Sequence, residues 1–164
     1  MPYLPCFGMR VILPKQFENV EYYGKGPYEN YVDRNNSCRI GLYDQTVKEQ
    51  FYPYIRPQET GNKTEVRWWK LTNKAGQGAV FKSDVPFSAS ALNYLTEDLD
   101  DGINKEAHQS HSGELEERDF VQFRILAKQM GLGCIDSWGA WPLKNYMIPY
   151  GDYSFTFLIL PTQK

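Results

Sequence analysis

The segment Asp119-Phe-Val-Gln-Phe-Arg-Ile-Leu-Ala-Lys-Gln129 carries the clearest structural signal in the sequence. Apolar side chains stand at every second position, and these are Val121, Phe123, Ile125 and Ala127. Polar side chains at Gln122, Arg124 and Lys128 point to the opposite side. A period of two places these sets on opposite faces of an extended chain, so the segment predicts a β-strand with one buried face.

Similar patterns occur along the rest of the chain. We expect further strands at residues 7–13, 19–23, 63–72, 79–82, 87–91 and 153–160. In the 63–72 strand, Thr64, Val66, Trp68 and Lys70 should share one face, and Asn73–Gly78 should close a hairpin to 79–82. One or two helical turns are expected at 94–99, and segments 24–36, 52–62 and 131–149 read as irregular. Many short strands with turn signals indicate an all-β fold, a sandwich or a similar architecture.

Length and charge limit the class of protein. The 164 residues suit a single domain, 1–164, without an evident internal boundary. Eighteen Lys and Arg against 20 Asp and Glu give a net charge of −2, which excludes the broad basic surface of a nucleic-acid binder. No continuous apolar run is long enough to span a membrane. The aromatic content of 15% suits pleated, half-buried sheet surfaces.

The sequence gives only weak signals for metal-binding or catalytic residues. His108 and His111 are three residues apart with Glu106 and Glu114 nearby, but Ser and Gly around them favour a solvated loop over a metal site. The three cysteines form no CxxC pair, so neither a disulfide framework nor a zinc knuckle is expected. The acidic run 114–119 reads as a solvated turn, not as a pair of carboxylates with separated pKa values. We therefore expect no catalytic residue, metal or cofactor in this chain.

The glycine-rich segment Gly131-Leu-Gly-Cys-Ile-Asp-Ser-Trp-Gly-Ala-Trp-Pro142 places Trp138 and Trp141 in a loop. An indole face is flat and electron-rich, so it suits the C–H face of a pyranose ring. Asp136 beside it could orient sugar hydroxyls. The alternative is that both tryptophans pack in the core, and residue chemistry alone leaves both interpretations open.

Three long motifs then occur in order: Gly26-Pro-Tyr-Glu-Asn-Tyr-Val-Asp-Arg34, Pro53-Tyr-Ile-Arg-Pro-Gln-Glu-Thr-Gly-Asn62 and Gln129-Met-Gly-Leu-Gly-Cys-Ile-Asp-Ser-Trp138. Together they resemble the C-terminal small-chain domain of the large β-galactosidases of glycoside hydrolase family 2. The resemblance implies an antiparallel β-supersandwich of the galactose-mutarotase-like type, of which this chain is similar to the larger, C-terminal part. It also implies that the catalytic glutamates belong to a separate barrel domain, absent here.

The resemblance further assigns residues. Trp138 matches the family tryptophan that stacks on sugar at the outer subsite, with Asp136 and Trp141 as weaker candidates beside it. The family pattern Gly-Gly-Asp-Asp-Ser-Trp is replaced here by Gly133-Cys-Ile-Asp-Ser-Trp138. Glu29-Asn30 and Glu59 to Asn62 are interpreted as residues that pin loops by bonding to turn backbone.

The leading hypothesis is thus a non-catalytic domain of a β-galactosidase, with β-galactoside sugar and the enzyme's other domains as partners. The alternatives are a free-standing carbohydrate-binding or interaction module and, from fold analogy alone, a mutarotase-like catalyst. Unpaired sheet edges would favour a homodimer. No secretion signal is visible, so we expect a cytoplasmic location, or a periplasmic one if the parent carries a signal.

Overall fold

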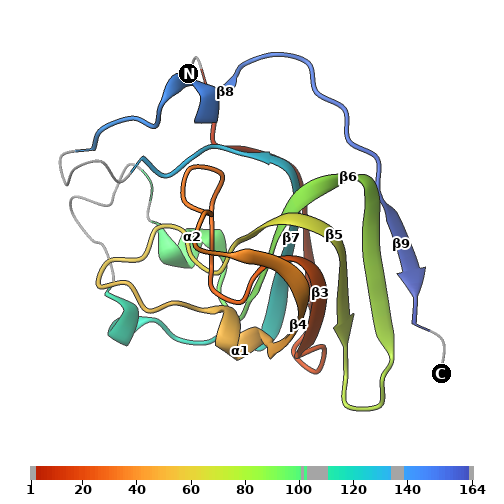
Figure 1. Ribbon diagram of the computed structural model, residues 1–164. Helices are drawn as coiled ribbons and strands as arrows, with labels where there is room; N and C mark the ends of the chain where they lie inside the picture. Colours follow the sequence, from red (N-terminus) through yellow and green to blue (C-terminus); the bar gives the residue numbers. More distant parts are fainter. Residues whose placement is uncertain (1–2, 101, 103–110, 134–138, 163–164) are drawn as a thin grey trace.

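The chain folds into a curved antiparallel sheet from which loops extend to one side (Figure 1). The computed structural model describes residues 3–100, 102, 111–133 and 139–162. Its strands are β1 (Tyr3–Leu4), β2 (Cys6–Pro14), β3 (Asn19–Gly26), β4 (Arg39–Thr46), β5 (Lys63–Thr72), β6 (Gly78–Leu92), β7 (Phe120–Gln129), β8 (Ile148–Pro149) and β9 (Leu158–Pro161). The short helices are α1 (Val47–Gln50), α2 (Thr96–Leu99), η2 (Ser112–Glu114) and η3 (Lys144–Tyr146). This architecture confirms the expected all-β class.

The main sheet has the strand order β2-β7-β6-β5-β3-β4, and β9 adds to β6. Strand β6 is 15 residues long and bends through the sheet (Figure 1). It pairs with β5 in both of its parts, whereas β9 pairs only with its first part and β7 only with its second. The two strands expected at 79–82 and 87–91 are therefore one continuous bent strand. A separate small sheet joins β1 to β8.

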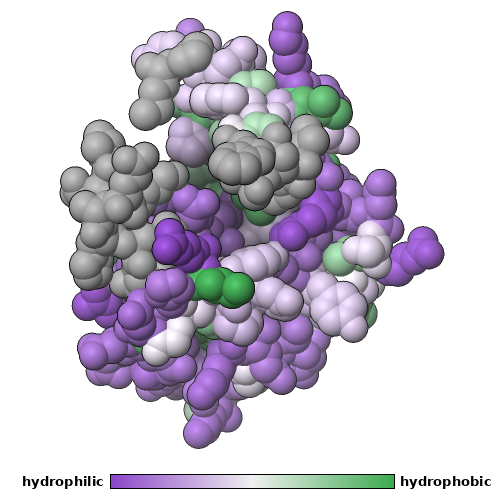
Figure 2. All heavy atoms as spheres, turned by 90° about the vertical axis from the view of Figure 1, so that its left-hand side faces the viewer, coloured by the Kyte–Doolittle hydropathy of each residue, from purple (hydrophilic) through white to green (hydrophobic). Residues whose placement is uncertain are grey.

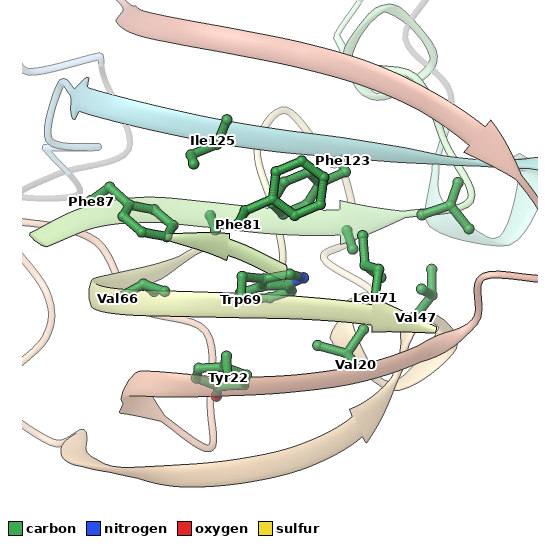
Figure 3. Packing of buried hydrophobic residues seen from close by; sticks show 13 residues of the cluster. Val20, Tyr22, Val47, Val66, Trp69, Leu71, Phe81, Phe87, Phe123 and Ile125 are labelled. Carbon is green, nitrogen blue, oxygen red and sulfur yellow. The ribbon is translucent and has the colours of Figure 1, made fainter. Parts of the chain in front are cut away.

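The core lies on the inner face of the curved sheet (Figure 3). Trp69 of β5 is fully buried and stacks on Tyr22 of β3, with 4.9 Å between ring centroids. Phe123 of β7 lies 4.5 Å from Phe81 of β6, measured between ring centroids. These aromatic rings bury apolar surface, and the burial of apolar surface is the dominant favourable contribution to folding.

Strand β7 confirms the prediction made for its buried face. Val121, Phe123 and Ile125 are fully buried in the core. The opposite face is also covered, since Gln122 and Arg124 are only 2% and 7% exposed. Gln122 bonds to Arg10 of β2 and Thr96 of α2, and Arg124 bonds to Glu59, so polar side chains are satisfied on this covered face.

The alternation expected for β5 is wrong beyond Val66. The pairing of β5 with β6 shifts register on both sides of Val66, and Glu65 has a φ of 55°. As a result Val66 and Trp69 are both buried, whereas Trp68 lies on the outer face. The irregularity changes which side chains face the core, which a strict period of two does not predict.

Other boundaries differ from expectation. Strand β4 was not predicted, because its apolar residues Ile40 and Leu42 face outwards and Gly41 interrupts the pattern. Residues 24–26 belong to β3 instead of a loop, and the closing strand is shorter than 153–160. The helical turn expected within 94–99 is confirmed as α2.

A row of side chains crosses the outer face of the sheet. The strand register aligns Leu42, Tyr23, Trp68, Lys82 and Leu158 on neighbouring strands. Leu42 is 72% exposed and Leu158 is 53% exposed.

In the part of the chain that the structure describes, no helix is long and apolar enough to cross a membrane.

Candidate functional site

Of the predicted sugar-contacting residues, the structure describes Trp141. Trp138 and Asp136, like His108, lie outside the described residues. The segments that lead to and from Trp138, residues 131–133 and 139–142, are described. Figure 2 views the molecule from the left-hand side of Figure 1 and shows a mainly hydrophilic surface with scattered hydrophobic side chains.

The stem of the Trp138 loop, residues 130–133, is held by Asp33 of the first motif and by backbone carbonyls of two other segments. The backbone N–H of Gly133 donates to Asp33 Oδ2 at 2.9 Å, although Asp33 is 100 residues away in sequence. The backbone N–H of Gly131 donates to the carbonyl of Tyr146 at 2.8 Å, and that of Met130 to the carbonyl of Pro5, also at 2.8 Å. These contacts fix where the loop leaves the sheet.

Glycine is required at both ends of this stem. A Cβ atom on Gly131 would lie 2.5 Å from Asp33 Oδ2. Gly133 has a φ of +78°, and a Cβ atom there would lie 2.6 Å from the carbonyl oxygen of Ala140. The glycine spacing therefore has a steric cause: it lets the two sides of the stem approach each other.

Trp141 is not a core residue. Its side chain is 62% exposed, and its ring centroid lies 6.0 Å from that of Tyr3. This excludes core packing for Trp141 and leaves an aromatic surface beside the Trp138 loop.

Glu29 connects the first motif to the second. Its Oε1 accepts a hydrogen bond from Arg34 Nη2 at 2.8 Å and another from the Tyr54 hydroxyl. Its Oε2 accepts from the backbone N–H of Gly61 at 2.7 Å. Burial and the bonded carboxylate of Glu29 together raise the pKa of Tyr54 to about 12, so this hydroxyl stays protonated and donates. The interpretation of Glu29 as a loop-pinning residue is confirmed.

Asn30 and Asn62 form the second part of this connection. Asn30 is fully buried; its Oδ1 accepts from the backbone N–H of Thr64 at 2.9 Å, and its Nδ2 donates to the carbonyls of Lys25 and Tyr28. Asn62 Nδ2 donates to the carbonyl of Asn30 at 2.8 Å. These bonds satisfy backbone groups that a turn would otherwise leave unpaired.

Glu59 joins the loops to the sheet. Arg124 Nη1 donates to both carboxylate oxygens of Glu59, at 2.9 and 2.8 Å. The two side chains are only 8% and 17% exposed. This near-buried ion pair explains why Arg124 stands on the polar face of β7.

A small cavity of about 200 Å³ lies beside the loop stem. It is lined by Arg34, Tyr54, Arg56, Gln58, Glu59 and Leu132. Leu132 belongs to the segment leading to Trp138, so polar side chains of the first two motifs lie next to the Trp138 stem.

Among the described residues there is no cluster of three or more potential metal ligands. His111 instead caps η2: its backbone N–H and its Nδ1 both lie within hydrogen-bonding distance of Glu114 Oε2, at 2.6 and 3.1 Å. Glu117 lies between Lys15 and Lys48 at 3.7 and 3.8 Å, as expected for a surface acidic residue.

Sequence reasoning missed several residues of this arrangement. Asp33, Arg34 and Arg124 were not singled out, and Tyr54 was quoted only as part of a motif. Asp33 and Arg34 stand inside the first motif, so their signal was present. The partners of Arg124 could not be found, because Glu59 is 65 residues away in sequence.

The structure defines an all-β sandwich domain that exposes the aromatic side chain of Trp141 in its loops. The family model described as "Beta galactosidase small chain" matches residues 1–159, and the chain belongs to this family. It is 40% identical over 156 residues to a β-galactosidase of Priestia megaterium, covering 95% of this chain. It is 35% identical over 152 residues to the β-galactosidase BgaC of Bifidobacterium adolescentis, covering 91% of this chain. A β-galactosidase of Streptococcus thermophilus is 33% identical over 163 residues, or 98% of this chain.

The chain spans only a small part of these relatives. It covers 14% of the Priestia megaterium and Bifidobacterium adolescentis proteins and 15% of the Streptococcus thermophilus protein. The matched region is thus one domain of a much larger polypeptide in each relative.

Proposed function

We propose that this chain acts as a non-catalytic domain of a β-galactosidase and supplies Trp138 to the outer sugar subsite. Trp138 stacks on the sugar ring, Asp136 orients a hydroxyl, and Trp141 extends the aromatic surface. The catalytic carboxylates belong to another domain, which performs retaining hydrolysis through a covalent galactosyl intermediate. By itself the chain hydrolyses no β-galactoside.

The observation that carries this proposal is the hydrogen bond from Gly133 to Asp33. It holds the start of the Trp138 segment at a defined place on the sheet. A stacking residue contributes most when its loop is fixed before the ligand arrives, because less conformational entropy is then lost on binding. The exposure of Trp141, three residues beyond Trp138, supports the same assignment.

The test is a Trp138→Ala substitution in the β-galactosidase that contains this chain. We expect the KM for lactose to rise at least tenfold while the melting temperature changes little, since a loop tryptophan that stacks on sugar supports little of the fold. Trp138→Phe should recover part of the affinity because it retains an aromatic face. Unchanged kinetics for Trp138→Ala would exclude the assignment.

Other domains of the same enzyme are the partners that the outer sheet face fits. The exposed row from Leu42 to Leu158 is apolar except for Lys82, and another domain could cover it. We also propose homodimerisation of the isolated chain through the free edge of β4. Light scattering of the isolated chain checks this, and a monodisperse monomer at high concentration contradicts it.

We place the parent enzyme in the cytoplasm, or in the periplasm where it carries a signal.

A further inference from the structure

A second, larger cavity of about 560 Å³ lies between the loop after β3, helix α1 and the segment after α1. Its lining includes Tyr28, Glu49, Gln50, Tyr52 and Lys63. The volume lies within the range of about 300–1,000 Å³ found for small-molecule sites. Within the described part of the chain, neither residues 131–133 and 139–142 nor the acidic run 114–119 line it.

Lys63, in the wall of this cavity, makes fewer hydrogen bonds to the described residues than its ammonium group can donate. The residue is 1% exposed, and its Nζ donates to the carbonyl of Gly61 at 3.3 Å. An ammonium group has three donors, so two of them lack a protein acceptor among the described residues. Leaving buried donors unpaired is costly, which favours a ligand that accepts from them.

Gln50, in the same wall, has a side-chain oxygen that accepts no hydrogen bond from the described residues. It is 2% exposed, and its Nε2 donates to Gln45 Oε1 at 2.7 Å. Its Oε1 is buried and finds no hydrogen-bond donor within the part of the chain that is described. The cavity thus combines an unsatisfied donor with an unsatisfied acceptor. A hydroxyl is the common group that serves both, because it accepts through its lone pairs and donates through its proton.

The charges around the cavity balance. Arg34 and Glu29 neutralise each other in an ion pair of 2.8 Å. Glu49 is engaged by the N–H and the hydroxyl of Thr46, at 2.6 and 2.9 Å. One cation, Lys63, and one anion, Glu49, then remain, so the cavity favours neither a strongly anionic nor a strongly cationic ligand.

Aromatic side chains surround the opening. Tyr28 is 74% exposed and Tyr52 is 54% exposed. The ring of Tyr52 lies 4.7 Å from that of Tyr54, measured between centroids. Aromatic faces pack well against the C–H groups of a compact polyol, whereas the tyrosine hydroxyls remain available for hydrogen bonds.

We propose that this cavity is a binding site for a neutral polyhydroxylated ligand, with Lys63 donating to one hydroxyl and Gln50 accepting from another. A monosaccharide meets these requirements, and so does a smaller polyol such as glycerol. Among the described residues, Arg34 and Tyr54 line both this cavity and the smaller one beside the loop stem.

The test is a titration of the 164-residue chain with D-galactose, D-glucose and glycerol, followed by calorimetry and by NMR shifts of the Gln50 side-chain amide. Lys63→Met removes the donors while keeping the length of the side chain. The matched control is Lys74→Met, since Lys74 is 89% exposed and far from the cavity lining. Trp138→Ala separates this site from the proposed subsite.

We expect saturable binding of at least one hexose, followed as a shift of the Gln50 side-chain amide, that is unchanged in Lys74→Met and weakened at least tenfold in Lys63→Met. Tighter binding of a hexose than of glycerol identifies a saccharide site, whereas equal affinity identifies a general polyol site. If Lys63→Met fails to fold, Tyr52→Ala takes its place at the opening, with the same expected loss. Wild-type affinity in the cavity variants, or no saturable binding of any of the three probes, overturns the proposal. Loss of binding in Trp138→Ala alone assigns the sugar to the Trp138 loop instead.

Discussion

Asp33 and Gly133 are joined by a hydrogen bond of 2.9 Å from the glycine N–H to the Asp33 carboxylate. Asp33 belongs to the loop after β3, and Gly133 begins the segment that leads to Trp138. The same carboxylate oxygen lies where a side chain at Gly131 would clash. One acidic residue therefore both anchors the stem and requires glycine beside it, which links the first and third motifs physically.

Replacing Asp33 with Ala should release this stem. The N–H of Gly133 loses its acceptor, so the free energy of unfolding of the isolated chain should fall by about 1–3 kcal/mol. In the parent enzyme the KM for lactose should rise, because Trp138 loses its fixed position. Asp33→Asn, which retains a side-chain oxygen, should recover most of both properties. Urea denaturation and steady-state kinetics measure the two effects, and an Asp33→Ala enzyme with normal KM would separate the stem from sugar binding.

Two glycines of the same loop offer a matched comparison. Gly133 and Gly139 have φ values of +78° and +82°, so alanine is strained at either position. Only at Gly133 would the new Cβ also clash, 2.6 Å from the carbonyl of Ala140, whereas it would meet nothing within 4 Å at Gly139. Gly139→Ala should lower the free energy of unfolding by about 1 kcal/mol, and Gly133→Ala by clearly more. Equal thermal shifts for the two variants would contradict the steric account of the stem.

The fold was predictable from sequence where one sheet face is apolar and the other polar. Val121, Phe123 and Ile125 alternate in this way, and the structure buries all three. Strand β4 was missed because its apolar side chains face outwards, so its pattern does not indicate a core face. The alternation of buried and exposed side chains changes at Val66, where the register with β6 shifts. This change was missed because the register depends on the neighbouring strand and not on the sequence of β5 alone.

The site was predictable only in part. Glu29 and Asn30 could be interpreted as loop-pinning residues from their types and their turn-rich surroundings. Their partners could not, since Gly61 and Thr64 lie more than 30 residues away in sequence, and the sheet topology alone brings them together. The buried setting of Lys63 was likewise hidden, because a lysine in an alternating strand is expected to face water.

The Glu59–Arg124 pair gives a test of how the loops are attached to the sheet. Glu59→Gln leaves a nearly buried guanidinium without its counter-ion and should cost about 3–5 kcal/mol of unfolding free energy. The double variant Glu59→Leu/Arg124→Met removes both charges and should regain most of that loss. Denaturant unfolding of Glu59→Leu, Arg124→Met and the double variant measures the coupling energy. Additive losses in the double variant would mean that the pair contributes little beyond its separate contacts.

The stability of the chain should depend on pH through Lys63. Burial lowers the pKa of Lys63 from 10.5 to about 8 in the folded chain. Between these values the unfolded chain binds more protons than the folded one, so the free energy of unfolding contributed by this group rises with pH. The expected gain is about 2 kcal/mol between pH 7.5 and 9.5.

Other groups limit the pH range in which this gain can be measured. Burial raises the pKa of Tyr22 and Tyr54 in the folded chain, and both hydroxyls therefore lower stability once the pH exceeds about 10, where tyrosines of the unfolded chain ionise. Below that range, comparison with Lys63→Met isolates the lysine, because the variant keeps every other titrating group. We expect the free energy of unfolding of the wild type minus that of the variant to rise by about 2 kcal/mol as the pH increases from 7.5 to 9.5. A difference that stays constant across this range would show that Lys63 titrates normally and that its ammonium group is not buried in solution.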